Sequence, residues 1–104
     1  MHHLIDQHRA EIAVTCRRYG VRRLEVFGSA ARGEDFDPEQ SDADFLVAFD
    51  PAVPGLSPLE QYFGLAGALE HLLGRPVDLV EAGALRNPFI LAAVNQTREV
   101  IYAS

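Results

Sequence analysis

Two acidic residues at the mouth of an apolar segment constrain this chain more than any other feature. Asp42 and Asp44 flank Ala43, and the residues that follow, 45–49, are all apolar. Successive side chains on a β-strand alternate between its faces, so both carboxylates would project from the same face. Two carboxylates held side by side repel each other, and a divalent cation is the usual relief. The pair therefore predicts a metal site, against the plainer interpretation of a strand that begins in solvent.

The composition indicates one globular domain over residues 1–104. Hydrophobic residues make up 48% of the chain and charged residues 23%, which suits one core rather than separate catalytic and substrate domains. The charged amino terminus lacks a signal-peptide core, and no apolar run reaches the length of a membrane span. The single cysteine, Cys16, excludes an internal disulfide, and together these features predict a cytoplasmic protein. We expect Cys16 to be a small buried hydrophobe rather than a nucleophile.

The charged residues limit the ligands that the chain can bind. The formal net charge of −6 argues against tight, unaided binding to a nucleic-acid backbone. All nine basic residues are arginines. Because a Walker-type phosphate loop needs a lysine, any nucleotide site here must use backbone amides, arginine and metal.

The order of the expected elements is that of a small α/β (α+β) domain. Ser57 and Glu60 form a capping box, and Gly20 and Gly74 are helix stops. Apolar periodicity and turn residues give the remaining boundaries. The expected helices cover residues 4–19, 58–73 and 87–95, and the expected strands cover 21–27, 42–49, 76–80 and 100–102.

A phosphate-binding turn is expected directly after the first strand. Gly28 and Ser29 end that strand and open a helical turn, where free N–H groups and the helix dipole favour an anion. Glycine allows the backbone to approach closely, and the serine hydroxyl adds a donor. Arg32, one turn later, could reach a nucleotide phosphate, although a surface arginine is nearly as common an outcome.

Asp78 is the third acid of interest. It lies in a strand short enough to be interior, where an unpaired buried carboxylate would cost several kcal/mol, so we expect it to have a partner. The alternative is an aspartate at a strand edge that faces water. Three acids on adjacent strands would complete a two-metal site, with ions roughly 3.5–4 Å apart. No histidine is assigned a role, because the spacing of His2, His3 and His8 matches no zinc pattern.

Three segments together carry a family resemblance. Residues 26–34 contain the Gly-Ser pair, residues 41–47 contain the Asp-Ala-Asp motif, and residues 77–80 contain the later aspartate. This combination resembles the minimal nucleotidyltransferase (MNT) family of the DNA polymerase β superfamily. The resemblance covers nearly the whole chain and implies a polymerase β-like nucleotidyltransferase fold, a small mixed β-sheet with flanking helices. The loop before Asp42 is slightly longer than usual, and Ala43 and Phe45 depart from the typical I-D-L, but the carboxylates are all present.

The resemblance also implies a function. Family members of this size resemble antitoxins encoded beside HEPN ribonuclease toxins, and they transfer AMP from ATP to a protein hydroxyl, commonly a tyrosine of the toxin. It implies a two-Mg²⁺ site, ATP as substrate, a HEPN-type toxin as hetero-oligomeric partner, and no direct contact with nucleic acid or membrane. The implied roles are triphosphate binding by Gly28 and Ser29, ligation of both ions by Asp42 and Asp44, and ligation plus proton acceptance by Asp78.

Two other functions remain open at this point. The chain could neutralise a partner by masking it, without catalysis. Transfer to a small molecule is disfavoured, because larger relatives with that activity carry a helical acceptor domain for which this chain has no room.

Overall fold

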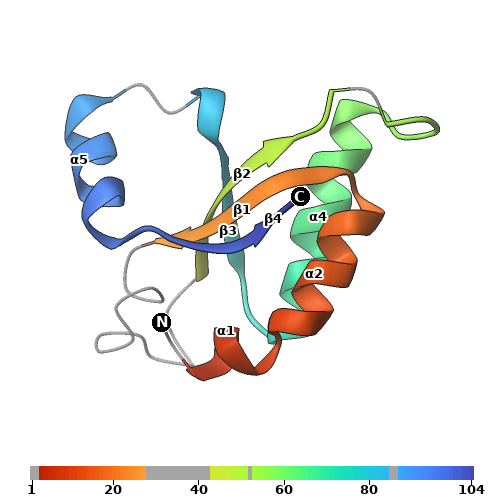
Figure 1. Ribbon diagram of the computed structural model, residues 1–104, viewed down its shortest axis with the longest axis horizontal. Helices are drawn as coiled ribbons and strands as arrows, with labels where there is room; N and C mark the ends of the chain where they lie inside the picture. The colour runs from red at the N-terminus through yellow and green to blue at the C-terminus, as the bar shows by residue number, and fades with distance from the viewer. Residues whose placement is uncertain (1–2, 28–42, 52, 85–86) are drawn as a thin grey trace.

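The computed structural model describes residues 3–27, 43–51, 53–84 and 87–104. Its described elements follow the order α1-α2-β1-β2-α4-β3-η1-α5-β4 along the chain (Figure 1). The helices are α1 (His3–Gln7), α2 (Arg9–Arg18), α4 (Pro58–Leu73), the short 3₁₀ helix η1 (Ala82–Ala84) and α5 (Pro88–Thr97). The strands are β1 (Val21–Phe27), β2 (Ala43–Phe49), β3 (Val77–Glu81) and β4 (Glu99–Ala103).

The strands form one mixed sheet in the order β3-β2-β1-β4. β1 runs antiparallel to both β2 and β4, and β2 runs parallel to β3. The chain crosses from β3 at one edge to β4 at the other through η1 and α5. The expected α/β class with a small mixed sheet is confirmed.

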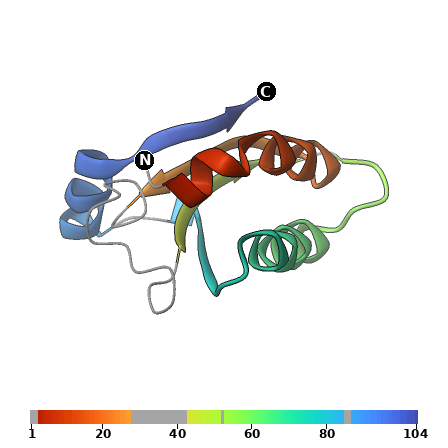
Figure 2. The same ribbon diagram turned by 90° about the horizontal axis from the view of Figure 1, so that it is seen from below.

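One face of the sheet is covered by α2 and α4, which lie on the same side of the strands in both views (Figures 1 and 2). Alternate residues point toward these helices, Leu24 and Val26 from β1 and Phe45 and Val47 from β2, and all four are buried. α4 contributes a stripe with a spacing of four residues, typical of a helix packed along one side. The fully buried members of this core include Ile12, Cys16, Leu24, Val26, Phe45, Val47, Leu65 and Leu69.

Cys16 is fully buried on α2, as expected for a small hydrophobe. Burial raises the pKa of its thiol to about 12, with a smaller opposing effect from Arg17. The thiolate form is therefore suppressed at neutral pH, and this cysteine is no nucleophile in the folded protein.

The amino-terminal helix differs from the expectation. The single helix over residues 4–19 is divided into α1 and α2 at His8. The His8 N–H donates to the carbonyl of Ile5, three residues back rather than four (3.2 Å), and its backbone dihedrals, φ −105 and ψ 14, leave the helical region. Apolar periodicity continues across this turn, so the sequence pattern does not reveal it.

The ends of α4 follow the expected capping signals. The Ser57 hydroxyl accepts a hydrogen bond from the Glu60 N–H (3.2 Å), and Pro58 occupies the first helical position. Gly74 ends the helix with φ 67, and its N–H donates to the carbonyl of Glu70 (2.8 Å). Within the described ranges, no helix combines the length and apolar character needed to cross a bilayer.

Candidate active site

Asp44 and Asp78 lie on adjacent strands at matching positions. In the parallel pairing of β2 with β3, Asp44 is the register partner of Asp78, and Phe45 is the partner of Leu79. Paired residues project from the same face of a sheet, about 4.8 Å apart along the hydrogen-bonding direction. Because Phe45 and Leu79 are buried beneath the helices, Asp44 and Asp78 project from the opposite face, which we call the outer face.

The position of β3 corrects one expectation. We expected an interior strand, but β3 lies at the edge of the sheet, and Asp78 is exposed. Among the described residues, β3 is covered on the side of α4, where Leu79 is buried and the Tyr62 hydroxyl donates to the carbonyl of Leu79. The alternation of apolar residues around Asp78 reflects this one-sided burial. Because water reaches the carboxylate, the cost of burying it without a partner does not arise.

The other predicted site residues lie outside the described residues: Gly28, Ser29, Arg32 and Asp42. Their predicted roles stay predictions. The described part of the chain does show where these segments begin. Phe27, the last residue of β1, is the register partner of Asp44 in β2, so the strand that leads to the Gly-Ser pair ends beside one of the acids.

The two described aspartates suit a hard divalent cation. Mg²⁺ in nucleotide-processing sites is bound by one or two carboxylates, with the substrate phosphates and water supplying the remaining oxygens. Among the described residues, no group of three or more histidine, cysteine, aspartate or glutamate side chains is arranged to hold a metal. The third predicted ligand, Asp42, is not among them. Asp44 and Asp78 therefore fit such an ion as a pair.

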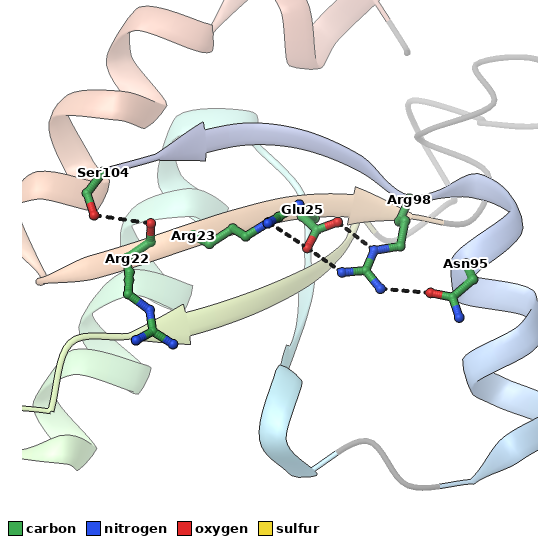
Figure 3. A network of polar contacts seen from close by, with 6 residues as sticks. All are labelled: Arg22, Arg23, Glu25, Asn95, Arg98 and Ser104. Atoms are coloured by element: carbon green, nitrogen blue, oxygen red, sulfur yellow. Dashed lines mark hydrogen bonds and ion pairs between the residues drawn. The ribbon is translucent and has the colours of Figure 1, made fainter.

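An ion-pair network around the buried carboxylate of Glu25 lies on the outer face and was not predicted from the sequence (Figure 3). Glu25 of the central strand β1 is only 4% exposed. Its carboxylate accepts from Arg98 Nε (2.6 Å) and Nη2 (2.7 Å), and Arg23 Nε lies 3.1 Å from Oε1. Arg98 also donates through Nη1 to Asn95 Oδ1 of α5 (2.7 Å). The network thereby joins β1 to the turn between α5 and β4.

This network keeps Glu25 charged. The hydrogen bonds from Arg98 are the main cause that lowers the pKa of Glu25, and they exceed the opposing effect of burial. The same bonds raise the pKa of Arg98. Alternation along β1 predicts only that residues 23 and 25 share a face. No nearby sequence pattern indicates that Arg98, from the far end of the chain, is the main partner of Glu25.

Comparisons with known proteins identify the family of this chain. Residues 11–101 match the family model described as a nucleotidyltransferase domain. The chain is 39% identical over 101 residues to the protein adenylyltransferase MntA of Thermococcus cleftensis, covering 95% of this chain and 88% of that protein. A structure described as a minimal nucleotidyltransferase is 38% identical, has a TM-score of 0.70, and covers 91% of this chain and 90% of its own.

A more distant structure shares the fold. It comes from a tri-AMPylated Shewanella oneidensis HEPN toxin in complex with an MNT antitoxin, with 19% identity, a TM-score of 0.61, and coverage of 95% of this chain and 72% of that one. The nucleotidyltransferase fold that the resemblance implied is thus confirmed. With its family match spanning most of its length and a relative of 39% identity, the chain belongs to the nucleotidyltransferase domain family of enzymes, as the resemblance predicted.

Proposed function

We propose that this protein is an Mg²⁺-dependent protein adenylyltransferase that transfers AMP from ATP to a hydroxyl of a HEPN-type toxin and thereby acts as its antitoxin. The observation that carries the proposal is the pairing of Asp44 with Asp78 on the outer face, in a chain that is 39% identical to a protein adenylyltransferase. Likeness to a chain from a toxin–antitoxin complex supports the choice of partner.

The transfer exchanges the phosphoanhydride bond between the α- and β-phosphates of ATP for a phosphodiester bond at the same α-phosphorus. An acceptor hydroxyl oxygen, in our proposal that of a tyrosine, bonds to the α-phosphorus of ATP, and the bond to the β-phosphate oxygen breaks. Pyrophosphate leaves, and the hydroxyl proton passes to the Asp78 carboxylate. Little covalent work falls to the protein, so alignment and charge neutralisation account for most of the rate.

In this proposal the carboxylates bind the metal ions, and the turn at Gly28 and Ser29 binds the triphosphate. Asp42, Asp44 and Asp78 would hold two Mg²⁺ ions, which neutralise charge on the triphosphate and on the attacking and leaving oxygens. The backbone of Gly28 and Ser29, with Arg32, would hold the triphosphate. The edge position and exposure of Asp78 leave it accessible to an acceptor as large as a protein.

The test incubates the protein with a candidate HEPN-type toxin, ATP and Mg²⁺. Mass spectrometry should show a gain of about 329 Da per transfer, one AMP less water, on the toxin. Asp44→Asn should abolish the gain, because it keeps the side-chain shape and removes the charge that binds metal.

Asp50→Asn is the matched control, because it makes the same change just beyond the other end of β2 and should leave transfer intact. EDTA should abolish the gain for every variant. If the wild-type protein neutralises the toxin without a mass change, and Asp44→Asn neutralises it equally well, the protein masks its partner and the proposal is wrong.

A further inference from the structure

A hollow of about 110 Å³ opens on the outer face beside the two aspartates. Its lining includes Arg23, Glu25, Leu46, Ala48, Ala82 and Arg98. Leu46 is two residues beyond Asp44 on the same face of β2, a step of about 7 Å along a strand. The hollow therefore begins one side-chain spacing away from the acids.

The side chains that line the hollow carry more positive than negative charge, although the protein is acidic and Asp44 and Asp78 lie one side-chain spacing away. Two guanidinium groups, those of Arg23 and Arg98, contact the single carboxylate of Glu25, whereas the whole chain has a formal net charge of −6. Such a reversal of sign favours an anionic group over a neutral one.

Of the two arginines that line the hollow, Arg23 is the one with unused hydrogen-bond donors among the described residues. Arg98 directs Nε and Nη2 at Glu25 and Nη1 at Asn95. Arg23 contacts Glu25 through Nε, and in the described part of the chain its two terminal amino groups have no hydrogen-bond partner. Its side chain is 51% exposed. Arg23 therefore presents a planar pair of donors suited to a carboxylate.

The size and the lining of the hollow limit the kind of ligand that it can bind. Small-molecule and cofactor pockets are typically about 300–1,000 Å³, so a hollow this small suits a single side chain rather than a nucleotide. Leu46 and Ala48 offer an apolar surface next to the arginine. A side chain with a short apolar stem and a carboxylate head matches both features.

We infer that this hollow binds an acidic side chain of the protein acceptor while the acceptor hydroxyl lies at Asp44 and Asp78. The inference rests on the proposed function. An extended segment repeats its side-chain direction every second residue, so the acid lies about two to four residues from the modified hydroxyl. Arg23 is then a specificity-determining residue, and it acts on the acceptor rather than on the nucleotide.

Nuclear magnetic resonance with short synthetic peptides tests this without any transfer step. The probes are the capped tripeptide Glu-Ala-Tyr and its neutral counterpart Gln-Ala-Tyr, titrated into the full ¹⁵N-labelled chain. The glutamate peptide should shift the Arg23 Nε–H signal and the amides of Leu46 and Ala48, and it should bind about five- to tenfold more tightly than the glutamine peptide.

Arg23→Gln should remove this difference, and Arg23→Lys should restore part of it. Arg22→Gln is the matched control: it removes the same charge from the neighbouring residue, whose guanidinium points away from Glu25 (Figure 3), and should keep the difference. Arg23→Gln should still fold, because Arg98 continues to neutralise Glu25.

Two results would overturn the inference: equal binding of the two peptides by the wild-type protein, or Mg²⁺–ATP shifting the Arg23 signal while Arg23→Gln weakens ATP binding. The latter would assign the hollow to the nucleotide. The proposed function fails separately, by the absence of the mass gain on the toxin. If that gain is seen, Arg23→Gln should raise KM for the toxin and leave kcat unchanged.

Discussion

Arg98→Ala should lower the free energy of unfolding by about 2–3 kcal/mol at pH 7, because it removes the main partner of a buried carboxylate. Breaking a fully buried ion pair typically costs about 3–5 kcal/mol. Two features of the structure reduce that figure here. Arg98 is 35% exposed, so solvent already weakens part of the pair, and Arg23 remains 3.1 Å from the Glu25 carboxylate.

The pH dependence of this loss follows from the lowered pKa of Glu25. A carboxyl group whose pKa is lower in the folded state contributes stability above its unfolded value, here 4.5, and that stability is lost as the pH falls through the folded-state pKa. Arg98→Ala removes the largest cause of the lowered pKa of Glu25. The variant therefore loses less stability than the wild-type protein when Glu25 is protonated. The difference between wild type and variant should therefore shrink as the pH falls below 4.5.

Urea unfolding followed by far-ultraviolet circular dichroism, at pH 7 and at several acid values, measures both effects. Arg22→Ala is the control, an exposed arginine on the same strand outside the ion pairs, and should change stability by less than about 0.5 kcal/mol. A double-mutant cycle with Glu25→Gln should give a coupling energy of at least about 1 kcal/mol. A loss below about 0.5 kcal/mol, or one that is equal at neutral and acid pH, would refute the argument.

Two further predictions concern the core and the turn before β1. Cys16 should resist alkylation at pH 8 in the folded protein and react on denaturation, since burial raises its pKa to about 12; mass spectrometry after iodoacetamide treatment checks this. Gly20→Ala should cost at least about 2 kcal/mol, because φ is +68 and the new Cβ would clash with Val53 Cγ2. Gly74→Ala, at φ +67 with no atom within 4 Å, should cost only the backbone strain of about 1–2 kcal/mol; equal losses at the two glycines would contradict the clash.

Features with local signals could be predicted from the sequence. The start of α4 depends on Ser57, Pro58 and Glu60, which lie within one helical turn of one another. The strand positions depend on alternation, and the same alternation places Asp44 and Leu46 on one face. The apolar neighbours of Asp78 likewise indicated which way its side chain points relative to theirs.

Features that depend on distant residues could not be predicted in this way. The edge position of β3 follows from strand order, which is set by pairing between segments far apart in the chain. Glu25 and Arg98 are 73 residues apart, so no short pattern joins them. The turn at His8 leaves the apolar spacing unchanged and is visible only in the backbone.

The outer face uses acidic residues in two physically distinct ways. Glu25 is buried and carries its own cations, Arg98 and Arg23, so its charge is already neutralised within the fold. Asp78 is exposed and, within the described residues, has no ion pair, while its register partner is a second acid. Like charges directly opposite each other on neighbouring strands are destabilising, so this pair does not contribute to holding the sheet together.

That contrast accounts for the expected behaviour of Asp44→Asn. Asp44→Asn keeps the side-chain shape at the start of β2, so the variant should still fold, whereas the same kind of change at Glu25 leaves two arginines without their carboxylate. Two carboxylates at matching positions on neighbouring strands suit a divalent cation as their ligand. In the proposed reaction that cation is the Mg²⁺ that binds the triphosphate, so loss of transfer in a variant that still folds is the outcome that separates catalysis from masking.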